Sequence, residues 1–183
     1  MHSILEDGTE WEAGCKRMML SRWRERRNGT VVAAAGLFYG DYLHTMTQLA
    51  GPMGLVYGFE PTSTVKLARA TAAANHLGAR IVQACLSNTT AEVASMCGFG
   101  GQAQIASVGE RRFRDCAHSW TPVTCTTLDR ALPWPTRPVA MLQLDLAGHE
   151  APALQGAMKL IDRWRPVLAT AFSIQKPPID RPR

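Results

Sequence analysis

The feature that most restricts the fold of this sequence is an alternation of short apolar runs with segments of helical spacing. Five runs of strand length are predominantly apolar on consecutive residues, at 30–35, 55–59, 79–86, 139–146 and 167–173. Such runs are typical of strands that are buried on both faces of a parallel sheet. Because helical patterns separate them, we expect right-handed βαβ crossovers and an α/β, doubly wound, mainly parallel sheet.

The segments between the strands are expected to be helical where apolar spacing ends at glycine or proline. These helices are predicted over residues 41–50, 63–77, 127–132 and 149–164. The segment 88–123 is rich in Gly, Ser, Thr and Gln, and we expect short strands and a long surface loop there.

The composition, with 46% hydrophobic and 19% charged residues, is that of a globular protein, and 183 residues favour one main domain. We therefore predict an N-terminal amphipathic helix over 1–29, a domain over 30–175 and an irregular tail over 176–183.

The N-terminal segment combines an apolar stripe with a basic cluster. Five apolar residues recur at three- to four-residue spacing: Trp11, Cys15, Met18, Met19 and Trp23. This spacing predicts an amphipathic helix whose arginines and lysine form a solvated face. Nucleic acid is the alternative partner for these charges, but no aromatic interleaving or nucleic-acid motif accompanies them. The apolar stripe packs either on the sheet of its own chain or on a second subunit, as in a homodimer.

Several protein classes are disfavoured. No apolar run approaches the roughly 20 residues of a transmembrane helix, so we expect no membrane span. The first twelve residues include four acids rather than the basic start and apolar core of a signal peptide, which favours a cytoplasmic protein. The five cysteines are an odd number without CxxC spacing, so we expect a reducing compartment, no disulfide framework and no metal site.

The turns after the strands are the candidate site, because ligands of a doubly wound sheet bind beyond the carboxyl ends of its strands. Gly36 and Gly40 follow the first strand, where the absence of Cβ atoms lets the backbone approach a ligand. Glu60 ends the second strand, 24 residues after Gly36. From this position an acid can accept hydrogen bonds from the ribose hydroxyls of an adenosine. Alternatively, Glu60 is a solvated acid at a strand end.

The fourth strand ends in a polar cluster, LQLDLAGHE, which contains Asp145, His149 and Glu150. The Asp145 carboxylate can orient a cationic ligand or, with His149, assist the deprotonation of a hydroxyl. His149 is suited to a general base because an ordinary imidazole has a pKa of about 6.5. We therefore expect catalytic roles for Asp145 and His149. Capping of the following helix is the alternative for all three side chains, and for Glu150 it is at least as well supported.

Taken in order, these segments resemble the FkbM-type S-adenosylmethionine-dependent methyltransferases. The resemblance rests on VVAAAGLFYGDY, VYGFEP, ACLSN, PVTCTTLDRAL, LQLDLAGHE and RPVLATAF, and covers about residues 28–173. Its most specific parts are VYGFEP and the succession of TTLD and LDLAGHE. It implies a Rossmann-like sheet of the class I methyltransferase type. It also implies methyl transfer from S-adenosylmethionine to an oxygen of a small molecule, sugar or lipid.

The same resemblance implies residue roles. Cofactor-binding residues are expected at Gly36, Gly40, Glu60, Leu86, Ser87 and Asp145. Leu86 and Ser87 belong to this set because the end of the third strand approaches the adenine. Gly148 and Glu150 match the glycine and the final acid of the family pattern D-V-E-G-x-E.

Three residues depart from the family patterns. Where the family resembles D-V-G-A-N-x-G in its first turn, this chain has Ala34 for the acid and Phe38 for the Asn; Ala147 replaces the acid of D-V-E-G. About ten residues remain after Ser173, fewer than a closing antiparallel pair of strands needs. Each lost polar contact weakens binding by about 1–3 kcal/mol if its partner stays buried and unpaired. Two hypotheses follow: an active O-methyltransferase, and a methyltransferase fold that no longer catalyses and binds a partner instead.

Overall fold

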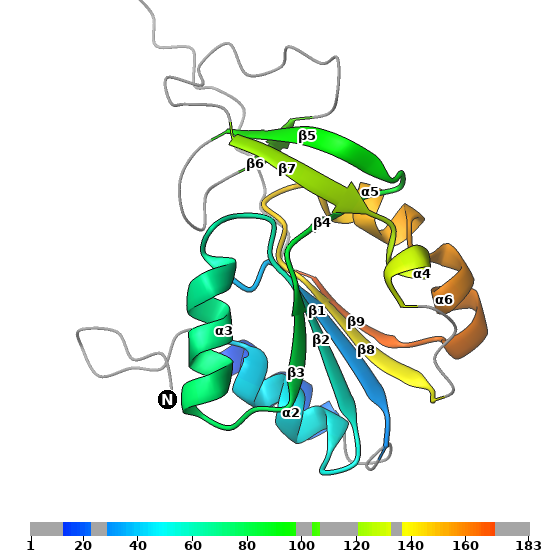
Figure 1. Cartoon of the computed structure of the whole chain (residues 1–183). Helices are drawn as coiled ribbons and strands as arrows, with labels where there is room; N and C mark the ends of the chain where they lie inside the picture. Colours follow the sequence, from blue (N-terminus) through cyan, green and yellow to red (C-terminus); the bar gives the residue numbers. More distant parts are fainter. Residues whose placement is uncertain (1–12, 23–28, 98–103, 107–120, 133–136, 171–183) are drawn as a thin grey trace, which may run out of the picture.

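The computed structural model describes residues 13–22, 29–97, 104–106, 121–132 and 137–170. Its centre is a five-stranded sheet with helices on both faces (Figure 1). The strand order is β3 (Ala79–Val82), β2 (Leu55–Phe59), β1 (Val31–Ala35), β8 (Val139–Leu144) and β9 (Val167–Thr170). Every neighbouring pair in this sheet is parallel, so the predicted α/β, doubly wound architecture is confirmed.

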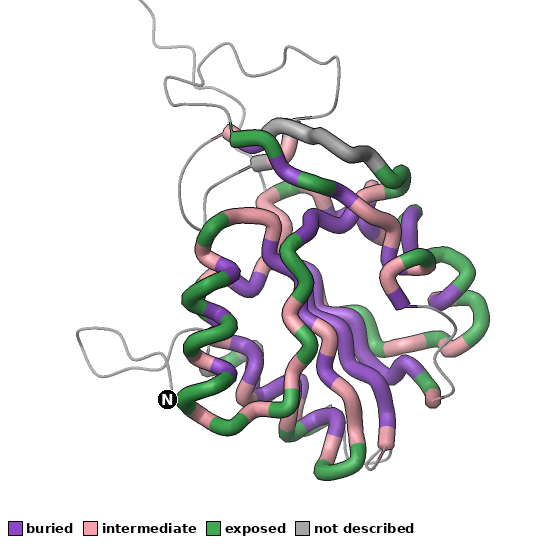
Figure 2. The backbone as a smooth tube through the Cα atoms, in the orientation of Figure 1, coloured by how far each residue is buried: buried purple, intermediate pink, exposed green. Residues whose placement is uncertain are grey.

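The helices cover the two faces of the sheet in two groups (Figure 1). One group is α1 (Ala13–Arg22), α2 (Leu43–Ala50) and α3 (Val65–Ala74), and the other is α4 (Leu128–Ala131), α5 (Glu150–Gln155) and α6 (Met158–Trp164). Val32 and Ala34 of β1 pack with the first group, whereas Val31 and Ala33 pack with the second. Because both faces are covered, β1 and β8 are buried along their whole length (Figure 2). This burial accounts for strands that are apolar on consecutive residues.

The third predicted strand, 79–86, is divided between two sheets, and the prediction of one continuous strand is wrong. β3 belongs to the parallel sheet, but the chain then leaves it, and β4 (Cys85–Leu86) pairs with a different strand. The second sheet has the order β4, β7 (Thr121–Thr126), β5 (Ala91–Cys97) and β6 (Gln104–Ala106). It lies beyond the carboxyl-end edge of the parallel sheet (Figure 1). The apolar pattern of 79–86 did not reveal that its two halves have different partners.

The predicted helix 149–164 is likewise divided, because α5 ends before Gly156 and α6 begins two residues later. Gly156 lies so close to the residue after β4 that a Cβ atom on Gly156 would be 2.0 Å from the carbonyl oxygen of Ser87. This junction therefore packs backbone against backbone, which a residue with a side chain would prevent.

The TTLD segment contributes to the same helical layer. The carboxylate of Asp129, in α4, accepts hydrogen bonds from the amides of Lys159 and Leu160 at 3.1 and 2.9 Å. These two amides belong to the first turn of α6, where backbone N–H groups lack helical partners. Thr127 in turn caps α4 by accepting from the amide of Arg130. The segment thus joins two short helices through side-chain caps.

Helix α1 contacts α2 through a face that includes a basic residue. Lys16 and Met19 are buried, whereas Arg17 is exposed. The Lys16 Nζ atom lies 5.3 Å from the centre of the Tyr42 ring, a cation–π arrangement. The expectation that the basic residues form only a solvated face is therefore wrong at Lys16, because residues three positions apart on a helix share one side.

Parts of several predictions lie outside the described residues. They include both ends of the N-terminal amphipathic helix, with Trp11 and Trp23, the tail 176–183, and the last residues of the predicted fifth strand. In the part of the chain that the structure describes, no helix is both long and apolar enough to cross a membrane.

Candidate functional site

The strand order reverses between β1 and β8, and ligands of doubly wound sheets bind at such a switch point. The two strand ends are in direct contact there. The amide of Asp145, after β8, donates to the carbonyl oxygen of Ala35 in β1 at 3.1 Å. On the other side of β1, the amide of Gly36 donates to the carbonyl oxygen of Phe59 in β2 at 3.0 Å. Gly36 has a φ of +81°, and a Cβ atom on it would lie 1.9 Å from the Asp145 carbonyl oxygen. Contact between protein strands is therefore enough to require glycine at this position.

Gly40 meets a different requirement. Its φ is +91°, and a Cβ atom would lie 2.9 Å from the Leu43 side chain and 3.3 Å from the Ala68 Cα atom in α3. It therefore lets the first turn pack against α3. Within the same turn, Phe38 has a φ of +48°, a conformation that costs an L-residue about 1–2 kcal/mol. The Asn of the resembled motif adopts this conformation more readily than a phenylalanine does.

Glu60 is buried and joins the first two turns of the sheet. Its Oε2 atom accepts a hydrogen bond from the amide of Phe38 at 2.9 Å. Its Oε1 atom accepts two more from Thr62, at 3.0 Å from the amide and 2.6 Å from the hydroxyl. The prediction of a solvated strand-end acid is therefore wrong. A carboxylate offers about four acceptor positions, and bonds from described residues use three of them at Glu60.

Glu150 is also buried, but its contacts are local. The Oε1 atom accepts hydrogen bonds from the amides of Leu146 and Gly148, at 2.8 and 3.3 Å. Both amides belong to the turn between β8 and α5, which also holds Ala147 at a φ of +51°. Glu150 therefore stabilises the turn that carries Asp145 to the edge of the sheet.

The electrostatics of the switch point favour a cation. Burial raises the pKa of the Asp145 carboxyl above its ordinary value, and the nearby Glu150 carboxylate raises it further. Burial lowers the pKa of the His149 imidazole below its ordinary value, and the same Glu150 carboxylate opposes that shift. A positively charged ligand near Asp145 would favour the charged form of its carboxyl group, which burial and Glu150 disfavour.

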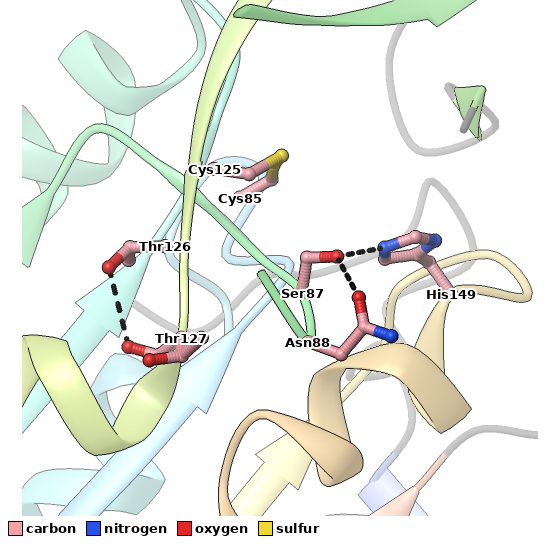
Figure 3. The surroundings of a disulfide bond; sticks show 7 residues. All are labelled: Cys85, Ser87, Asn88, Cys125, Thr126, Thr127 and His149. Carbon is pink, nitrogen blue, oxygen red and sulfur yellow. Dashed lines mark hydrogen bonds between the residues drawn. A yellow bond between two sulfur atoms is a disulfide. The ribbon is translucent and has the colours of Figure 1, made fainter. Parts of the chain in front are cut away.

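Ser87 and His149 meet at the carboxyl-end edge although they are 62 residues apart in the sequence (Figure 3). The His149 Nε2 atom lies 3.2 Å from the Ser87 Oγ atom. Ser87 Oγ in turn lies 3.4 Å from Asn88 Oδ1, and Asn88 Nδ2 lies 3.0 Å from Gln155 Oε1. His149 is the N-cap residue of α5 but makes no side-chain cap bond. The His149 ring therefore contacts Ser87, the residue after β4, rather than capping its own helix.

Two further residues belong to this cluster: Asn88 lies in the predicted site turn 86–88 but was assigned no role, and Gln155 was not predicted. Asn88 directly follows the predicted site residue Ser87, and a polar residue after a strand end is a general signal for such a position. Gln155 carries no comparable signal, because its partner is fixed only by how α5 packs. Leu86, by contrast, was predicted near the cofactor, but its side chain is buried in the core with Phe59 and Leu128.

A disulfide joins Cys85 and Cys125 beside this cluster (Figure 3). The two residues are partners in the parallel pairing of β4 and β7, with their Cα atoms 4.4 Å apart. The expectation that the cysteines form no disulfide is therefore wrong, because cysteine count and spacing carry no information on strand register. Among the described residues, no group of three or more His, Cys, Asp or Glu side chains is arranged to hold a metal ion.

The parallel sheet with helices on both faces, and with its polar residues gathered at the switch point, defines a Rossmann-like α/β protein. A model of the methyltransferase FkbM domain matches residues 31–180. The chain therefore belongs to the FkbM methyltransferase family, and the predicted resemblance is confirmed.

The fold is also similar to that of a solved structure, the methyltransferase FkbM from Methylobacillus flagellatus KT, with a TM-score of 0.56 and 13% sequence identity. The alignment covers 80% of this chain and 34% of that chain, so the sequence spans about a third of its length. At this identity the similarity concerns the fold alone. No curated protein matches the sequence.

Proposed function

We propose that this chain is an S-adenosylmethionine-dependent methyltransferase that methylates a hydroxyl oxygen of a small molecule, sugar or lipid, through a domain over residues 30–175. The observation that carries the proposal is the place of four polar residues at the carboxyl-end edge of a methyltransferase-family sheet: Glu60 and Asp145 directly follow β2 and β8, and Ser87 contacts His149. Family membership and the position of the switch point support it.

The residues present fit the cofactor at its ribose. Glu60 ends β2 with one acceptor position unused by the described residues, and a ribose hydroxyl can donate to it. Its three internal bonds also hold the carboxylate in place before a ligand arrives, which lowers the entropic cost of binding. In this proposal Gly36 lets the backbone of the first turn lie close to the cofactor, and Ser87 borders the adenine. Leu86, whose side chain lies in the core, would contribute its backbone there.

The cationic part of the cofactor fits the acidic end of β8. S-adenosylmethionine carries a sulfonium and an ammonium group, and both causes of the raised Asp145 pKa would be offset by a nearby positive charge. Asp145 is therefore proposed to orient the cofactor through its charged carboxylate.

Methyl transfer demands little acid–base chemistry from the protein. The cofactor supplies an already activated methyl group, so the chain has to align the acceptor oxygen and remove its proton. His149 is the proposed proton acceptor. Because burial lowers its pKa, the imidazole is neutral at neutral pH and has a lone pair available.

The proposal is tested by isothermal titration of the full chain with S-adenosylmethionine and with its demethylated product, supported by thermal-shift measurements with the same ligands. We expect saturable binding and an increase in the unfolding temperature. If millimolar ligand produces neither binding heat nor a thermal shift, an active enzyme of this type is excluded.

A second candidate, a methyltransferase fold that has lost catalysis and binds a partner, is favoured by one specific observation. The two turns that border the switch point each hold a non-glycine residue at positive φ where the family pattern has a polar residue: Phe38 and Ala147. Neither side chain can replace the hydrogen bonds of an Asn or an acid. Binding of the demethylated product without turnover of any acceptor would support this candidate over the first.

A further inference from the structure

The side chains of Ser87 and Asn88 contact the two ends of helix α5. Ser87 contacts His149, the residue before the first turn of α5, and Asn88 contacts Gln155, its last residue. Gly156 follows at once, and its lack of a Cβ atom allows the close approach to the Ser87 backbone. The Ser87 amide also donates to the carbonyl oxygen of Thr126 in β7 at 2.9 Å. Ser87 is therefore held from two sides.

The four side chains form a directed hydrogen-bond relay. Asn88 Nδ2 donates to Gln155 Oε1, which leaves Asn88 Oδ1 as an acceptor. The single hydroxyl hydrogen of Ser87 is directed to that oxygen. The Ser87 oxygen is then an acceptor toward His149, so the hydrogen between the two must come from the imidazole Nε2 atom.

We propose that Ser87 and Asn88 are positioning residues that fix His149 in the tautomer with hydrogen on Nε2, so that Nδ1 is the atom that accepts the proton of the methyl acceptor. The role of Nδ1 rests on the proposed function, whereas the tautomer does not. Figure 3 shows the second ring nitrogen on the side of the imidazole away from Ser87. A neutral imidazole has one donor and one acceptor nitrogen, so a hydrogen bond at one nitrogen decides the role of the other.

The surroundings of His149 are compatible with a neutral ring. Burial disfavours its charged form more than the carboxylate of Glu150, the next residue, favours it. In the alternative direction the Ser87 hydroxyl donates to Nε2, either with both amide side chains turned over or with its 3.4 Å contact to Asn88 Oδ1 left unused. That direction would place the hydrogen on Nδ1, so the tautomer distinguishes the two.

The test is a long-range proton–nitrogen NMR spectrum of the full-length protein with ¹⁵N-labelled histidine, recorded near pH 7.5 without cofactor. His149→Gln identifies the His149 signals among the five histidines. We expect one tautomer with Nε2 protonated and Nδ1 unprotonated, and not the averaged signals of a solvated ring. A protonated Nδ1 would overturn the proposal.

Two variants test the positioning roles, and two serve as controls. Ser87→Ala and Asn88→Ala should each shift the His149 nitrogen signals toward a tautomer mixture, while Ser87→Thr, which keeps the hydroxyl, should retain the wild-type spectrum. Asn88 is exposed, so its variant is expected to fold even if Ser87→Ala does not. Ser63→Ala, at an exposed serine on another turn, should change nothing. Unchanged signals in Asn88→Ala would refute the relay, and a failure to bind S-adenosylmethionine would refute only the proposed function.

Discussion

Two buried glutamates hold the turns at the switch point, and they do so in different ways. Glu60 joins the turn after β2 to the turn after β1, with a hydrogen bond to an amide 22 residues away. Among the described residues, Glu150 bonds to two amides, both within four residues of itself. Both side chains are 5% exposed, so burial alone does not distinguish them.

The difference concerns what each carboxylate can still do. Glu60 sets the relative position of two strand ends and is the residue proposed to bind the ribose, whereas Glu150 closes one turn and raises the pKa of Asp145. A residue that joins distant segments affects the shape of the site, and a residue that closes a turn affects mainly the presentation of one side chain. Substitutions at and beside these residues should therefore have graded effects.

The largest effect is expected for Gly36→Ala, at the contact between the two strand ends. The new Cβ atom would meet the Asp145 carbonyl oxygen at 1.9 Å, so we expect a loss of at least about 4 kcal/mol in the free energy of unfolding. Gly29→Ala is a matched control, because Gly29 has the same φ of +81° but open space around it. That variant should lose about 1 kcal/mol in chemical denaturation. Equal losses in the two variants would show that the strand contact is not tight.

The next largest effect is expected for Glu60→Ala. It leaves the amides of Phe38 and Thr62 without their acceptor, which should cost about 3 kcal/mol of stability. Affinity for S-adenosylmethionine should fall at least tenfold, about 1.4 kcal/mol, in calorimetric titration. The exposed acid Asp162 provides a control, since Asp162→Ala should alter neither quantity. Unchanged affinity in Glu60→Ala would show that the ribose is bound elsewhere.

A smaller effect is expected for Glu150→Ala. The amides of Leu146 and Gly148 lie in one surface turn, so water can replace part of the lost bonding, and we expect a loss of about 1–2 kcal/mol in chemical denaturation. The pKa of Asp145 should move down toward its ordinary value in an NMR titration, because one of its two causes is removed. A stability loss as large as that of Glu60→Ala would contradict the distinction between the two glutamates.

The smallest effect is a pH dependence at His149. Its folded-state pKa lies below the ordinary value of 6.5, so below that pH the unfolded chain binds more protons than the folded one. The resulting stability is fully present above about pH 6.5 and is lost as the pH falls through the folded-state pKa. Between about pH 7.5 and about pH 5.5, the unfolding temperature of the wild type should therefore fall more than that of His149→Gln. If the unfolding temperatures of the two proteins fall by the same amount over this pH range, His149 is not a buried, neutral residue.

The strands of the parallel sheet were predictable because their burial on two faces leaves a local mark in the sequence. β2 has the predicted bounds, and β1 and β8 differ from prediction by one or two residues at their ends. Glu60 and Asp145 could be selected for a related reason, since an acid directly after a buried strand reaches the ligand-binding edge by geometry alone. In both cases the prediction used only neighbours along the chain.

Other features depend on pairings between distant residues. The division of 79–86 follows from β4 pairing with β7, and the same pairing brings Cys85 and Cys125 together. The break at Gly156 depends on close contact with Ser87. Local apolar patterns are the same whether or not these contacts form, so no periodicity or composition could have indicated them.

The sequence by itself determined the parallel α/β architecture, the family and the acids at the ends of β2 and β8, because burial and strand ends are encoded in consecutive residues. Only the tertiary structure decided that Glu60 joins two turns, and that Ser87 meets His149 across 62 residues of sequence. Such contacts depend on strand order and register, which arise only when segments distant in the sequence pack together.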